Sequence, residues 1–67
     1  MGTFTPEEKV ERSIYPECSV YNRIKREHPD VAQTLKKKAI ARINNAYIDE
    51  IISLAKRDEL TSDIERW

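Results

Sequence analysis

The residues best suited to covalent chemistry in this sequence are its one cysteine and its one histidine, Cys18 and His28. A thiolate nucleophile needs a base within hydrogen-bond reach and a third group that orients the base. Cys18 and His28 stand ten residues apart, and Asp30 is the nearest candidate for the orienting role. A chain of 67 residues has little room for the pocket that such a site requires. We therefore expect no catalytic residues, and we interpret Cys18 as a small apolar side chain at the edge of the core.

The residue types also predict no metal site and no cofactor. One cysteine and one histidine cannot supply the four ligands of the usual structural zinc site. The acidic C-terminal segment lacks the spacing and the turn glycine of a calcium-binding loop. Its acids are Asp49, Glu50, Asp58, Glu59, Asp63 and Glu65. The chain has one glycine, Gly2, so a glycine-rich phosphate-binding loop is excluded, and we do not expect an enzyme.

Charge is distributed unevenly along the chain, although the formal net charge is zero. Acids outnumber bases in residues 1–21 and 46–67, whereas residues 22–45 hold seven bases and two acids. We call these seven bases the basic centre: Arg23, Lys25, Arg26, Lys36, Lys37, Lys38 and Arg42. If folding merges them into one patch, they suit phosphate contacts, which makes a nucleic-acid-binding regulator the alternative function. The patch lacks interleaved aromatic residues for base stacking, and pairing with the acidic ends is the simpler interpretation.

These residues must be positioned by helices, because good helix formers dominate the sequence and strand-like alternation is absent. Thr5-Pro6-Glu7-Glu8 predicts a helix start with Thr5 as N-cap. Pro16 is expected to end this helix and to open a second one that runs to about residue 27. The alternative is one helix kinked at Pro16, because the apolar residues on both sides of the proline stay in helical phase.

Asp30 and Gln33 form a second capping pattern, and nothing after it breaks a helix until about residue 58. The sequence therefore predicts one long, dominant helix over about 30–58, with a short C-terminal turn after it. The expected fold is a single small all-α domain over residues 1–67, with two short N-terminal helices packed on the long helix. A chain of this size without a disulfide depends on good helix packing or on a partner chain.

On a helical wheel the long helix shows two neighbouring apolar stripes. The first holds Ile40, Ile43, Tyr47, Ile51 and Leu54, and the second holds Ile48, Ile52 and Ala55. Together they cover about half of the circumference, where a surface helix usually shows an apolar arc of about 100°. Either the short helices wrap around and bury both stripes, or the second stripe contacts another protein.

The second stripe gives the candidate interface residues. They are Asn44, which lies inside the apolar arc, Ile48, Ile52, Ala55 and Trp67. An Asn in such a place can pair with its symmetry mate in a helical dimer. Trp67 either folds back onto Leu60 and Ile64 or anchors a partner.

The predicted function is therefore a small helical protein-interaction module, such as a regulator, inhibitor or assembly subunit, whose self-association we also expect. The chain has no apolar run long enough to cross a bilayer and no secretory signal, which predicts a cytoplasmic protein. Its small, charge-rich character is typical of a bacterial or phage accessory protein. The identity of its partner is left open.

Overall fold

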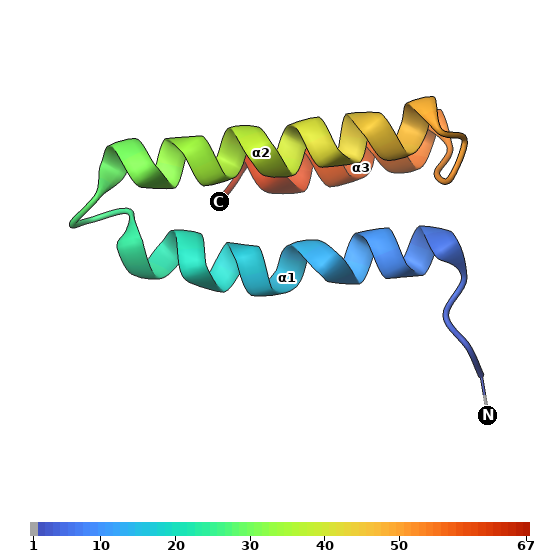
Figure 1. Cartoon of the computed structure of the whole chain (residues 1–67), viewed down its shortest axis with the longest axis horizontal. Helices are drawn as coiled ribbons and strands as arrows, with labels where there is room; N and C mark the ends of the chain where they lie inside the picture. The colour runs from blue at the N-terminus through green and yellow to red at the C-terminus, as the bar shows by residue number, and fades with distance from the viewer. Residues whose placement is uncertain (1) are drawn as a thin grey trace.

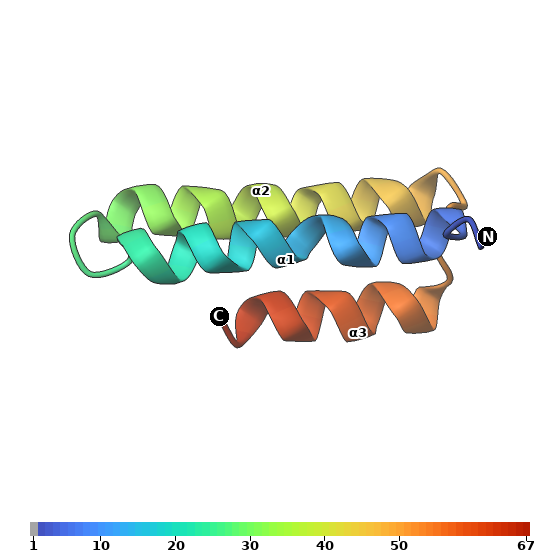
Figure 2. The same cartoon turned by 90° about the horizontal axis from the view of Figure 1, so that it is seen from below.

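The computed structural model describes residues 2–67, which form three α-helices packed side by side (Figure 1). The helices are α1 (Pro6–Ile24), α2 (Pro29–Ile48) and α3 (Leu54–Glu65). Figures 1 and 2 together show α2 running antiparallel to α1 and to α3, with α3 ending short of the α1–α2 turn. The predicted all-α class is confirmed. No helix in residues 2–67 has the length and apolar character needed to cross a membrane.

α1 is one helix that continues through Pro16. The predicted break at this residue was wrong, and a single helix, the alternative, is what forms. The proline removes one backbone donor from the helix, but helical phase is kept across it, so Ile14 and Tyr21 are both buried on one face. At its start, the Thr5 hydroxyl accepts a hydrogen bond from the Glu8 N–H at 3.2 Å, as the capping pattern predicts.

α2 begins one residue earlier than the sequence predicted. Pro29 occupies the first helical position, where its missing N–H costs nothing, and His28 is the N-cap without a side-chain cap bond. Asp30, the predicted cap, lies inside the first turn of the helix. Its carboxylate there still favours the positive end of the helix dipole.

The prediction of one long helix over 30–58 is wrong, because α2 ends at Ile48 and the chain reverses before α3. The Glu50 N–H donates to the Tyr47 carbonyl at 3.0 Å, and the Ile51 N–H donates to the Ala46 carbonyl at 2.9 Å. This pair of bonds is the Schellman ending of a helix, whose central residue adopts a left-handed conformation. Glycine usually occupies that position, but here Glu50 does, with φ at 62°.

Burial explains why the chain turns at a residue that disfavours the turn. A left-handed backbone at a non-glycine residue costs about 1–2 kcal/mol. Burying one Leu or Ile side chain stabilises the fold by about 1.5–3 kcal/mol. The reversal buries three of them, Ile52, Leu60 and Ile64, at 4%, 1% and 0% exposure. The gain from burial therefore exceeds the backbone cost.

α3 begins directly after Ser53, which acts as its N-cap once the chain has reversed. The Ser53 hydroxyl accepts a hydrogen bond from the Lys56 N–H at 3.1 Å and so caps the helix. The predicted short turn after residue 58 does not exist as a separate element, because residues 62–65 belong to α3. Three helices of 19, 20 and 12 residues therefore replace the arrangement built on one dominant helix.

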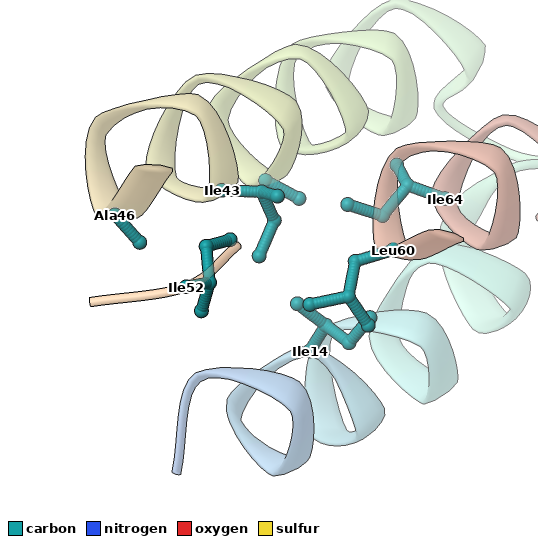
Figure 3. Packing of buried hydrophobic residues seen from close by; sticks show 7 residues of the cluster. Ile14, Ile43, Ala46, Ile52, Leu60 and Ile64 are labelled. Carbon is teal, nitrogen blue, oxygen red and sulfur yellow. The ribbon is translucent and has the colours of Figure 1, made fainter. Parts of the chain in front are cut away.

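The core lies between the three helices and the α2–α3 turn. Figure 3 shows Ile14 of α1, Ile43 of α2, Ile52 of the turn and Leu60 and Ile64 of α3 pointing toward one another. On α2 the remaining buried residues are all alanines, and they recur every seven residues at Ala32, Ala39 and Ala46. Small side chains at this spacing lie on one face and let the neighbouring helices approach α2 closely.

Polar contacts join the helices around this core. The Arg42 guanidinium of α2 pairs with the Glu17 carboxylate of α1. The Lys56 ammonium of α3 lies 3.3 Å from the Glu11 carboxylate of α1. The Lys36 ammonium donates to the Glu65 carbonyl at 3.0 Å, which satisfies one of the last carbonyls of α3. These contacts fix the three helices relative to one another at the edge of the core.

Because the chain reverses at Glu50, the sign of the change in the free energy of unfolding caused by Glu50→Gly distinguishes this turn from a continuous helix. Glu50→Gly should raise the free energy of unfolding by about 0.5–1 kcal/mol, because glycine adopts φ of 62° without strain. In a continuous helix the same change would lower it by about 1 kcal/mol. Urea unfolding followed by circular dichroism measures the difference. Asp49→Gly, at a residue with negative φ, is the matched control and should destabilise.

The Lys56 ion pairs give an alkaline pH dependence. Hydrogen bonds to Glu59 and then to Glu11 raise the pKa of Lys56 above its usual value of 10.5. The raised pKa means that these pairs stabilise the fold below pH 10.5 and lose that contribution as pH rises through the folded-state pKa. The midpoint temperature of thermal unfolding should therefore fall more steeply between pH 9 and about 12 for the wild type than for Lys56→Gln. Parallel curves for the two proteins would contradict this contribution.

Candidate protein-interaction face

The α2–α3 turn redistributes the apolar residues that the helical wheel had placed in two stripes. Ile52, which the wheel placed on the second stripe, is 4% exposed and belongs to the core. Ile51 and Leu54, which the wheel placed on the first stripe, are 42% and 50% exposed. The reason is that residues 49–53 leave the helical conformation, so the period of 3.6 no longer relates residues before the turn to residues after it.

A groove of about 420 Å³ runs along the surface between α2 and α3. Its lining residues are Lys37, Ile40, Ala41 and Asn44 of α2 and Arg57, Asp58 and Thr61 of α3. The floor is largely apolar, since Ile40 packs against the core from this side. The groove is open to solvent.

Two large apolar side chains extend the groove toward the α2–α3 turn. Ile48 follows Asn44 by four residues, and Leu54 precedes Asp58 by four, so each lies on the groove side of its helix. Ile48 is 64% exposed, the highest value among the large apolar side chains in residues 2–67 that are exposed. We call the groove together with Ile48 and Leu54 the α2–α3 face. The helical wheel did not give Leu54 as an interface residue, because it placed this residue on the first stripe of an unbroken helix.

The charges of the α2–α3 face differ at its two ends. Lys37 lies at the end nearer the start of α2, whereas Asp49 and Glu50 follow Ile48 at the other end. Within residues 2–67 none of these three forms an ion pair. Arg57, in contrast, is held in place over the Tyr47 ring at 4.9 Å and by Asp58 at 2.9 Å. The face therefore has a basic end and an acidic end, and between them lie apolar side chains and the Arg57–Asp58 pair.

The structure brings together only part of the predicted interface set. Asn44 and Ile48 are exposed neighbours on one side of α2. Ala55 is exposed on α3, one residue after Leu54, and so points about 100° away from it. Trp67 folds back onto the core, with its ring 5.7 Å from that of Tyr21. Ile52, as stated above, is buried and cannot contact a partner without unfolding the turn.

The basic centre does not form one continuous set of unpaired charges. Arg42 is paired with Glu17, and Lys36 donates to the Glu65 carbonyl while its ammonium also lies over the Tyr21 ring at 5.8 Å. Five members of the basic centre are exposed and form no ion pair with residues 2–67: Arg23, Lys25, Arg26, Lys37 and Lys38. The three lysines from 36 to 38 point in different directions around α2 because each step rotates by about 100°. Nucleic-acid binding by this centre stays a prediction.

The groups considered for chemistry lie apart. Cys18 is half-buried within α1, where its sulfur accepts a hydrogen bond from the Asn22 amide at 3.3 Å. His28 is exposed in the turn beyond the end of α1, and Asp30 lies in the first turn of α2. In residues 2–67 no group of three or more His, Cys, Asp or Glu side chains is arranged to hold a metal ion.

Comparison with protein-family models, with curated proteins and with solved structures finds no match for this chain. Its function must be inferred from its own surface. The α2–α3 face is the place where a groove, large exposed apolar side chains and unpaired charges of both signs adjoin one another.

The different placements of Ile52 and Ile48 predict different costs for the same substitution. Ile52→Val should lower the free energy of unfolding by about 0.5–1.5 kcal/mol, because it removes a methyl group from the core. Ile48→Val removes the same group from an exposed site and should change stability by less than about 0.5 kcal/mol. Urea unfolding at a protein concentration of a few micromolar compares the two. Equal losses would contradict the turn as described.

Proposed function

We propose that this protein is a small helical interaction module that binds an amphipathic helix of another polypeptide chain on its α2–α3 face. The observation that carries the proposal is the exposure of Ile48 and Leu54, at 64% and 50%, beside the groove between α2 and α3. Scattered exposed apolar residues are ordinary, but adjoining ones mark interaction sites. A helix that lies in a groove with its apolar ridge inward is a recurring mode of recognition.

The charges of the face specify the chemistry of the bound helix. Its apolar residues would contact Ile40, Ile48 and Leu54 in the middle of the face. An acidic residue would lie near Lys37, and a basic residue would lie near Asp49 and Glu50 at the other end. Such charge complementarity fixes the direction in which the helix lies and adds more to specificity than to affinity.

The size of the apolar surface sets the strength of binding to expect. Burying an exposed Ile or Leu contributes about 1.5–3 kcal/mol. Association itself costs at least about 4 kcal/mol in lost rotational and translational freedom. Burial of Ile40, Ile48 and Leu54 therefore supplies at most about 9 kcal/mol and leaves no more than about 5 kcal/mol after this cost, which supports weak binding with a dissociation constant of about 0.2 mM or above. A module of this kind suits reversible regulation or an assembly in which each contact is repeated.

Site-specific photocrosslinking tests this function and identifies the partner in the same experiment. A photoreactive benzoylphenylalanine would replace Ile48 in cells that express the protein naturally, and adducts would be identified by mass spectrometry. The same residue in place of Ala55, which is exposed but points away from the groove, is the matched control. We expect a defined adduct from the first position and not from the second. The crosslink should map to an amphipathic helix.

A second change makes the result specific to the face. Leu54→Asp places a charge among the apolar side chains that extend the groove, at a residue that is 50% exposed. It should abolish the adduct and leave the helical circular dichroism intact. Equal labelling from both positions, or an adduct that survives Leu54→Asp, would rule out a specific helix-binding face.

A further inference from the structure

The chemistry required of the bound helix is present in this chain itself. We infer that the α2–α3 face pairs with the same face of a second copy, so that two α2 helices lie antiparallel about a two-fold axis near Asn44. This inference rests on the proposed function and names its partner. It places the α2 helix of each copy against the α2–α3 face of the other.

Charge is the first observation that favours a second copy. Along the exposed side of α2, Lys37 lies toward the N-terminal end, and Asp49 and Glu50 lie at the C-terminal end. A two-fold axis reverses the direction of the helix, so the basic end of each copy meets the acidic end of the other. The last turn of α2 contains no basic residue of its own, so its two terminal carboxylates lie uncompensated at the negative end of the helix dipole. The lysine of a second copy would supply the missing positive charge.

Shape is the second observation. Lys37, Ala41, Asn44 and Ile48 follow one another at steps of four, three and four residues, which is the spacing of a helix-pairing seam. Antiparallel pairing about Asn44 sets Ile48 of one copy opposite Ile40 of the other. Ile40 is half-buried and lines the groove beside the small Ala41, whereas Ile48 is 64% exposed and projects. Ile48 of each copy would therefore enter the groove of the other, and in a two-fold dimer each such contact is made twice.

Asn44 suits the position on the axis. It is exposed on the groove in the single chain and has no side-chain hydrogen bond within residues 2–67. Its amide carries both donors and an acceptor, so two copies related by a two-fold axis can bond to each other reciprocally. A polar residue at the centre of an otherwise apolar seam fixes the register of the helices.

Light scattering after size-exclusion chromatography of the full chain tests the dimer. At a concentration of about 0.5 mM the mass should approach twice the 7.9 kDa of one chain, and it should fall on dilution and at high salt. Ala41→Glu puts a bulky charge into the seam and should raise the dissociation constant at least about tenfold. Ala55→Glu makes the same change on the outer side of α3 and should leave the mass unchanged.

A disulfide test places the axis. With Cys18→Ser removing the natural thiol, Asn44→Cys should give a crosslinked dimer on mild oxidation, because only residues near the axis bring their own copies within the 4–7 Å that a disulfide spans. Ala55→Cys in the same background should not. A chain that stays monomeric at this concentration, or that crosslinks equally from both positions, overturns the inference. If the monomer still gives an Ile48 photoadduct with a different protein, the interaction module stands and only the dimer fails.

Discussion

The left-handed backbone of Glu50 is the constraint on which the rest of the bundle depends. It allows two reverse hydrogen bonds to close α2 at Tyr47 and Ala46, and it turns the chain so that Ile52 enters the core. Ser53 then caps α3, which returns along α2 and α1 with Leu60 and Ile64 facing inward. Without this reversal, α1 and α2 would form an open hairpin with one side of the core uncovered. A small local cost is thus offset by a larger burial of apolar surface that lies many residues away.

The core that results is small, and its composition follows from that size. A chain of this length buries only about 60% of its unfolded surface. α2, the helix that both others contact, presents Ile43 and three alanines toward the interior, which lets α1 and α3 approach closely. Contacts at the edge supplement the core: the Arg42–Glu17 pair joins α1 to α2, and Lys56 joins α3 to α1. Ion pairs that are partly open to solvent contribute modestly, so packing carries most of the stability.

The same reversal that completes the core also creates the surface proposed for binding. Ile51, Ile52 and Leu54 are nearly consecutive, and the turn can direct only one of them inward. Ile52 is buried, whereas Ile51 and Leu54 stay exposed, and Leu54 lies with Ile48 beside the groove between α2 and α3. Folding and the proposed recognition therefore both depend on one short apolar segment. The unpaired charges at the two ends of this face have opposite signs, so they favour one orientation of a bound helix, the antiparallel one for a second copy of α2.

The sequence by itself determined the features that depend on neighbouring residues: the helical class, the Thr5 cap and the helix starts at Pro6 and near Pro29. It also related Asn44 to Ile48 through the helical period, which holds as long as the helix continues. Only the tertiary structure decided that α1 passes through Pro16 and that α2 ends at Ile48. Neither event has a strong local signal, because helical phase persists across the proline and a glutamate occupies the place where glycine would announce a helix end. Both outcomes follow from burial in the tertiary core, of Tyr21 in one case and of Leu60 and Ile64 in the other, and a pattern of neighbouring residues does not contain that energy.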